Sequence, residues 1–246
     1  MAIGATTLGA PANGALWVGF ACMTISALVF LFITYTSRNR GAALYHYLTT
    51  AVVTIASLAY LVMALGNSST PTANGRAFLW VRYADWVFTT PLLLVDIGLL
   101  AGADMMTIGW VVFCDVIMCV AGFAGVVSSG TNAAWPLFAF GMVAFLPIIH
   151  AIAITFNQAA AAKGPRTASL YSKLAVLLVV TWTAYPIIWA TGEGSQVSSV
   201  DQETIAYAFM DVVAKCVFGF ILLLGHASTA EEEEKYSTTT EGSRLI

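Results

Sequence analysis

Long apolar runs separated by short polar breaks dominate the pattern of this chain. Each run exceeds the roughly 20 residues that a helix needs to cross the hydrocarbon core of a bilayer. The runs are continuous rather than short and alternating, which favours helices over a transmembrane barrel. Seven membrane-spanning helices are therefore predicted, over residues 15–36, 43–66, 78–101, 106–128, 134–156, 169–191 and 203–225.

The composition supports a membrane location. Of the 246 residues, 59% are hydrophobic and 9% are charged, whereas an ordinary soluble domain is about 25% charged. The net charge of −3 is small and argues against a nucleic-acid partner. The cysteines fall inside apolar segments without disulfide or metal-ligand spacing, so no metal site is predicted; they are Cys22, Cys114, Cys119 and Cys216.

The basic residues outside the predicted spans are distributed unequally. Arg76 stands alone on one side of the bilayer, and the other side carries Arg38, Arg40, Lys163, Arg166, Lys235 and Arg244. Because positively charged loops stay in the cytoplasm, the N-terminus is predicted outside and the C-terminus inside. The predicted protein is all-α and multi-pass in the plasma membrane. It has an extracellular segment 1–14, a seven-helix domain 15–225 and a cytoplasmic acidic tail 226–246.

A lysine near the middle of the last span is the most informative residue. Lys215 follows Asp211 by one helical turn. A charged amine at this depth costs about 2.5–3.5 kcal/mol on insertion scales. An aldehyde bound to the amine as a Schiff base, with carboxylates as counter-ions, would account for its presence. The alternative is a purely structural network of ion pairs, which apolar packing can often replace without loss of stability.

The third span carries a second set of ionisable residues. Asp85 and Asp96 are three helical turns apart, about 16 Å along nearly the same helix face, with Thr89 between them. Arg82 lies one turn outward of Asp85. The predicted orientation therefore places one carboxylate of this span on the outer side of the Lys215 amine and one on its inner side.

The sixth predicted span carries an aromatic stripe. Trp182, Tyr185, Pro186 and Trp189 have the spacing that places residues on one helix face. Such a stripe is consistent with simple packing. If it faces the lysine helix and Trp86, it could instead hold a flat conjugated chain between rings.

Three motifs of this chain resemble those of the microbial (type 1) rhodopsins, and within that family those of the bacteriorhodopsin-like outward proton pumps. The similarity extends from the first span to the end of the seventh. The motifs are Arg82-Tyr83-Ala84-Asp85-Trp86-x-Phe88-Thr89-Thr90-Pro91-Leu92-Leu93-Leu94-x-Asp96, Trp182-x-x-Tyr185-Pro186-x-x-Trp189 and Asp211-x-x-x-Lys215.

The resemblance implies a bound pigment and a set of proton-carrying residues. All-trans retinal is expected as a covalent Schiff base on Lys215. Asp85 is expected to be the primary proton acceptor and Asp211 the second counter-ion. Asp96 is expected to be the internal proton donor, with Thr49 as its hydrogen-bond neighbour.

Further site residues follow from the same resemblance. The retinal contacts are expected to be Trp86, Thr90, Leu93, Met118, Gly122, Gly141, Phe145, Trp182, Tyr185, Pro186 and Trp189. The network around the Schiff base is expected to include Arg82, Tyr60, Tyr185 and Thr89. Glu193 and Glu203 fall where the pumps keep a proton-release pair, and Asp115 is expected to be neutral and held by a structural hydrogen bond.

Some positions depart from the archaeal pump pattern. Val53 stands where that pattern has a proline, and Phe138, Gly141 and Phe145 replace the more usual Trp, Ser and Met. The loss of the serine hydroxyl removes a dipole beside the retinal ring, which leaves the absorption colour open.

The predicted function is a light-driven outward proton pump, a transporter rather than an enzyme, with retinal, protons and the lipid bilayer as its partners. Asp96 is expected to stay protonated because it is far from any cation in a dry inner half. A photosensor of the same fold is one alternative, and a seven-helix receptor that binds no retinal is another. A homo-oligomer, trimer or other, is left open.

Overall fold

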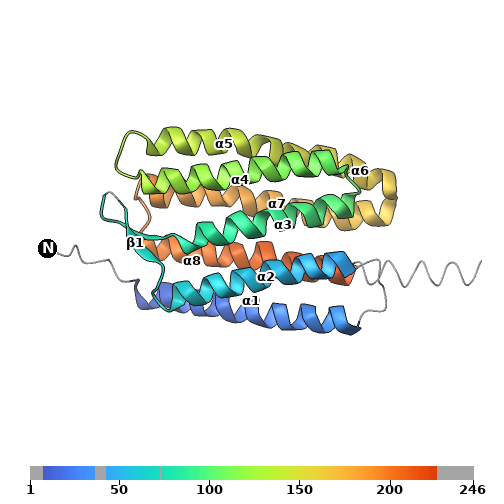
Figure 1. The fold of residues 1–246 in the computed structure, drawn as a ribbon, viewed down its shortest axis with the longest axis horizontal. Helices are drawn as coiled ribbons and strands as arrows, with labels where there is room; N and C mark the ends of the chain where they lie inside the picture. The colour runs from blue at the N-terminus through green and yellow to red at the C-terminus, as the bar shows by residue number, and fades with distance from the viewer. Residues whose placement is uncertain (1–7, 37–42, 73, 226–246) are drawn as a thin grey trace, which may run out of the picture.

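The computed structural model describes residues 8–36, 43–72 and 74–225. In this part of the chain seven helices are long and apolar enough to cross a membrane. They lie side by side as one bundle in which successive spans run in opposite directions (Figure 1). Their bounds are Ala10–Thr36 (α1), Ala43–Ala64 (α2), Val81–Ala101 (α3), Met105–Val127 (α4), Ala134–Lys163, Pro165–Gly194 and Val200–Gly225.

The last three spans contain wide π-helical turns. The fifth consists of α5 (Ala134–His150), η2 (Ala151–Thr155) and α6 (Phe156–Lys163), and the sixth of α7 (Pro165–Trp189) and η3 (Ala190–Gly194). The seventh begins with α8 (Val200–Asp211) and continues with η4 (Val212–Val217), which carries Lys215. Turns of this kind occur often at functional sites.

All seven predicted spans are confirmed, but several of their ends were wrong. The third helix begins at Val81 rather than at residue 78, because Ala77–Leu79 (β2) pairs in an antiparallel hairpin with Ser69–Pro71 (β1). The fifth span continues to Lys163 through the alanine-rich helix α6. The sixth begins at Pro165, because proline at a first helical position loses no hydrogen bond.

The start of the seventh span is set by local hydrogen bonds that the apolar pattern does not reveal. The Ser199 hydroxyl accepts a hydrogen bond from the backbone N–H of Gln202 at 3.2 Å, and the Gln202 side chain accepts one from the backbone N–H of Ser199 at 3.0 Å. This capping box satisfies the N–H groups of the first turn. It moves the helix start to Val200, three residues before the predicted one.

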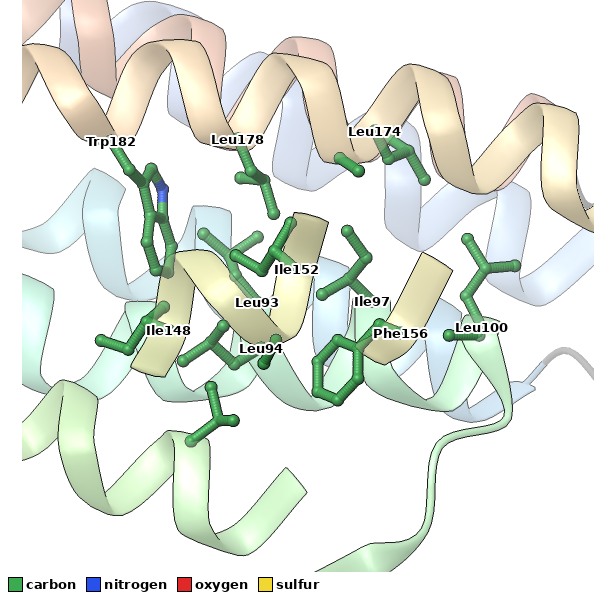
Figure 2. Packing of buried hydrophobic residues seen from close by; sticks show 14 of the residues in the cluster. Leu93, Leu94, Ile97, Leu100, Ile148, Ile152, Phe156, Leu174, Leu178 and Trp182 are labelled. Atoms are coloured by element: carbon green, nitrogen blue, oxygen red, sulfur yellow. The ribbon is translucent and has the colours of Figure 1, made fainter. Parts of the chain in front are cut away.

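The spans form a closed ring of helices, and one half of the bundle has an apolar core. Neighbouring spans pack against each other, and α8 also packs against α1. Figure 2 shows the apolar cluster between α3, the fifth span and α7, on the side of the bundle where α3 ends and α7 begins. Its labelled members are Leu93, Leu94, Ile97, Leu100, Ile148, Ile152, Phe156, Leu174, Leu178 and Trp182.

The described basic residues outside the predicted spans lie at the ends of the bundle as predicted. Lys163 and Arg166 are at the junction of α6 and α7, and the Lys163 amine donates to the carbonyls of Leu99 and Leu100 at 3.4 and 3.3 Å. Arg76 is at the opposite end, in the hairpin. Part of the predicted extracellular segment (residues 1–7), Arg38, Arg40, Lys235, Arg244 and the acidic tail lie outside the described residues.

Candidate functional site

The amine of Lys215 lies between two carboxylates from different helices. Its Nζ donates to Asp85 Oδ2 on α3 and, at 3.1 Å, to Asp211 Oδ1 one turn earlier in its own span. All three side chains are almost completely buried. An unpaired charge at this depth would be strongly destabilising, so the two carboxylates compensate the amine.

The two carboxylates differ in how many donors they accept. Asp211 accepts from the Tyr60 and Tyr185 hydroxyls at 2.7 Å each, from Trp86 Nε1 at 3.3 Å and from Lys215. The Asp85 carboxylate accepts from Lys215, and the Thr89 hydroxyl on the same helix also interacts with it. Protonation of Asp211 would disturb four existing hydrogen bonds, whereas the Asp85 carboxylate has fewer donors among the described residues.

The hydroxyl of Thr89 lies one turn along α3 from Asp85, as the spacing predicts. It donates to the Asp85 backbone carbonyl at 2.9 Å and is fully buried. Thr89 therefore faces the Lys215 region from the same helix as Asp85.

A mostly apolar cavity of about 760 Å³, including the space at its opening, begins at Lys215 and extends between α3, α4, α5 and α7. Apolar walls with a few polar groups at one end are typical of sites for small organic ligands. Every retinal contact expected from the sequence lines this cavity: Trp86, Thr90, Leu93, Met118, Gly122, Gly141, Phe145, Trp182, Tyr185, Pro186 and Trp189. Its wall also includes residues that the sequence reasoning did not assign, namely Tyr83, Cys119, Phe138, Met142, Tyr207 and Ala214.

Ring contacts lie along the wall of this cavity. Phe138 stacks on Trp189 with ring centroids 4.4 Å apart and planes 12° apart. Trp86 meets Tyr185 edge to face at 5.1 Å. The aromatic stripe of the sixth span therefore does line a cavity rather than serve only as packing.

Asp96 lies in the half of the bundle that has the apolar core, on the other side of the Lys215 amine from Arg82. Its side chain is fully buried, and its Oδ2 accepts a hydrogen bond from the Thr49 hydroxyl at 2.8 Å. The predicted pairing of Thr49 and Asp96 is thus confirmed. The amine and this carboxyl have no ion pair with each other in the described part of the chain.

Asp115 is buried beside the cavity and is bound by the Thr90 hydroxyl. The Thr90 oxygen lies 2.6 Å from Asp115 Oδ2 and 2.7 Å from the Trp86 carbonyl. A hydroxyl has one proton to donate, so a protonated Asp115 that donates to Thr90 satisfies both contacts. This hydrogen bond agrees with the predicted structural interaction of Asp115.

Arg82, which the resemblance places in the network around the Schiff base, is hydrogen-bonded to an outer glutamate in this structure. Its Nη1 lies 3.2 Å from Glu203 Oε1. Its Cζ also lies 4.5 Å from the centre of the Tyr207 ring. In this structure the guanidinium therefore pairs with the outer glutamate and packs on the Tyr207 ring.

Glu193 and Glu203 are both buried near this arginine, but they have different partners. Glu203 accepts from Arg82 and, at 2.8 Å, from Arg76 Nη2. Glu193 accepts from the hydroxyls of Tyr207 at 3.0 Å and Tyr83 at 3.4 Å. The two glutamates thus occupy one cluster, as expected, without a direct hydrogen bond among the described contacts.

Tyr207, Tyr83 and Arg76 are the members of this cluster that sequence reasoning missed. Tyr207 is four residues after Glu203 and four before Asp211, a spacing that places all three on one helix face. That signal was available in the sequence. The reach of Arg76 from the hairpin was not, because it depends on a contact between segments more than 120 residues apart.

The fold and the site define a class of protein: a seven-helix membrane protein with a buried lysine, two carboxylate counter-ions and a ligand cavity that begins at the amine. The sequence matches the family model described as bacteriorhodopsin-like protein over residues 11–229. The chain belongs to this family of retinal-binding, multi-pass membrane proteins.

Three known proteins illustrate the similarity. Opsin-1 of Neurospora crassa is 35% identical over 243 residues, which cover 92% of this chain and 80% of the relative. Archaerhodopsin-1 of Halorubrum ezzemoulense is 37% identical over 238 residues, covering 94% and 92%. The crystal structure of the light-driven proton pump CsR from Coccomyxa subellipsoidea superposes with a TM-score of 0.84 at 36% identity, covering 89% of this chain and 98% of that one.

These relationships bear on two predictions. Two of the solved structures that this chain resembles are titled light-driven proton pumps, which agrees with the prediction of a rhodopsin-class protein rather than an enzyme. Family membership also argues against a seven-helix receptor that binds no retinal.

Proposed function

We propose that this chain is a light-driven outward proton pump of the plasma membrane, with all-trans retinal bound as a Schiff base to Lys215. The observation that carries the proposal is the position of the amine between unlike acids. Asp85, which has fewer hydrogen-bond donors around it than Asp211 in the described part of the chain, touches the amine on one side. Asp96, paired with Thr49, lies about three helical turns along the same helix.

The residues that begin and line the cavity fit retinal. The cavity is almost entirely apolar, it is flanked by Trp86, Trp182 and Trp189, and its polar end is the Lys215 amine. Flat aromatic side chains suit a conjugated polyene. When bound, retinal supplies light absorption and an isomerisation that changes the direction and acidity of the N–H at Lys215 Nζ.

Asp85 takes the role of proton acceptor in this proposal. It touches Nζ directly, and fewer donors among the described residues hold its carboxylate than hold that of Asp211. Asp211 stays ionised as the permanent counter-ion, because four donors hold its two oxygens. A proton that leaves Nζ therefore moves to Asp85, toward the end of the bundle that carries Arg82 and Glu203.

Asp96 takes the role of proton donor to Nζ from the opposite side. Its carboxyl is fully buried, and its α3 neighbours Leu93 and Ile97 belong to the apolar cluster shown in Figure 2. With no cation in contact, a carboxyl in this setting is held in its neutral form and can donate. Acceptor and donor on opposite sides of one switching nitrogen make the transport directional.

The orientation follows from the basic residues. Lys163 and Arg166 mark the end nearest Asp96, and the positive-inside rule assigns this end to the cytoplasm. The Arg82, Glu193 and Glu203 cluster then faces the exterior, where the transported proton leaves.

The experiment is illumination of sealed cells or vesicles that contain the protein supplied with all-trans retinal. A pump produces a visible absorption band and an external acidification that a protonophore abolishes, and Asp85→Asn removes the acidification. The absence of a band refutes retinal binding. A band and photocycle without any sustained pH change refutes pumping and leaves the photosensor.

A further inference from the structure

Arg76 connects the extracellular hairpin to the proton-release cluster. Its backbone is fixed at the turn, where the carbonyl accepts from the Thr72 backbone N–H at 2.9 Å and from the Thr72 hydroxyl at 3.0 Å. Its Nη2 reaches the Ser198 carbonyl at 3.0 Å and Glu203 Oε2 at 2.8 Å. One side chain therefore ties the β1–β2 hairpin to the connection before α8.

With Arg76 in place, both oxygens of Glu203 face guanidinium groups. Arg82 binds Oε1 from α3, and Arg76 binds Oε2 from the hairpin. A guanidinium can only donate hydrogen bonds, so a proton on Glu203 would displace one of two charge-assisted contacts. Glu203 is therefore the fixed anion of the cluster.

Glu193 is in a different chemical setting. Its carboxylate oxygens meet the hydroxyls of Tyr83 from α3 and Tyr207 from α8. A phenol can either donate or accept, so these contacts are satisfied whether Glu193 is protonated or ionised. The remaining charged groups around it are Glu203, Arg82 and Arg76. Glu193 can hold and lose a proton without breaking an ion pair.

We propose that Arg76 is a positioning residue for proton release: by pairing with Glu203 it keeps that carboxylate ionised and assigns the releasable proton to Glu193. Its positive charge, at the rim of the cluster, also lowers the cost of leaving Glu193 ionised after release. This inference rests on the proposed pump function, since release has meaning only in a working photocycle.

The test follows proton release in vesicles with a pH-sensitive dye after a flash, over a range of pH, for the wild type and Arg76→Gln. Removal of one nearby positive charge makes Glu193 harder to ionise. Early release should therefore begin at a pH higher by about one unit. Arg76→Lys keeps the charge and should restore most of the wild-type profile. Lys173→Gln removes one positive charge at an exposed position of the opposite end and should change nothing.

Infrared difference spectra decide which glutamate carries the proton. The wild-type spectrum should show a carboxyl band that disappears on proton release. The spectrum of Glu193→Gln should lack this band. In Arg76→Gln part of that band should move to Glu203, and a second substitution, Glu203→Gln, should remove that part. An unchanged pH profile in Arg76→Gln, or a wild-type band that belongs to Glu203, overturns the inference while the pump proposal stands. Failure of the wild type to pump at all overturns the pump proposal instead.

Discussion

Gly219 allows a test of whether the packing of the last span controls the proton donor. This glycine is buried four residues after Lys215. A methyl group added to it would lie 2.6 Å from a ring carbon of Phe30 and 2.6 Å from Cγ2 of Thr49. Because carbon atoms in contact are normally about 3.5–4.0 Å apart, Gly219→Ala must move these neighbours or the helix by roughly 1 Å.

Such a movement has two measurable consequences. Overpacking of a tight interior typically costs about 1–3 kcal/mol in the free energy of unfolding. Thr49 is also the residue that donates to Asp96 at 2.8 Å, and a shift of about 1 Å would take this pair beyond hydrogen-bond range. Loss of one such bond is worth about 1 kcal/mol, so reprotonation from Asp96 should change by roughly 3- to 10-fold.

The assays are thermal loss of the visible band and recovery of the photocycle after a flash. Gly109→Ala is the matched control, because a methyl group at Gly109 meets nothing within 4 Å and alanine favours a helix. Thr49→Val removes the hydroxyl without adding bulk at position 219, and should alter recovery more than stability. If Gly219→Ala keeps both the wild-type stability and the wild-type recovery time, the packing argument is wrong.

Three further changes test other parts of the site. Lys215→Ala should abolish the visible band and, by leaving two buried carboxylates without their cation, cost about 3–5 kcal/mol in thermal unfolding. Asp96→Asn should slow recovery by about 100-fold or more, with rescue by azide; unchanged recovery would exclude the donor role. Asp104 caps α4 by accepting from the Thr107 hydroxyl and backbone N–H, which hold its pKa below the usual 3.8. The stability difference between wild type and Asp104→Ala should therefore be present at neutral pH and disappear as the pH falls below that lowered pKa; a difference that persists in strong acid would contradict this.

The number of spans and the main residues around the amine could be predicted because their signals are local. A run of more than 20 apolar residues predicts a membrane helix wherever it occurs. The distance from Asp85 to Asp96 along α3 follows from helix geometry alone. The pairing of Lys215 with Asp211 also follows from a spacing of four residues, and it persists within the wide turn η4.

The ends of the spans and the wide turns could not be predicted in the same way. The sequence analysis began the third helix at residue 78, whereas residues 77–79 form a strand. The prediction was wrong because a short run of buried apolar side chains fits either a helix or a strand. The hydrogen bonds to β1 select the strand. The π-helical turns likewise have no periodic signature over five or six residues.

The amino-acid sequence by itself determined that this is a seven-span membrane protein with a lysine in the middle of its last span. It also determined that Asp211 lies one helical turn from that lysine and that Asp85 and Asp96 lie three turns apart on one helix. These properties depend on hydrophobic length and residue spacing within single helices. Only the tertiary structure decided that Arg82 and Arg76 both pair with Glu203. It also decided that Asp211 accepts from more donors than Asp85 does among the described residues. The reason is that long charged side chains can reach several partners of similar energy, and the choice depends on which helices are brought together around them.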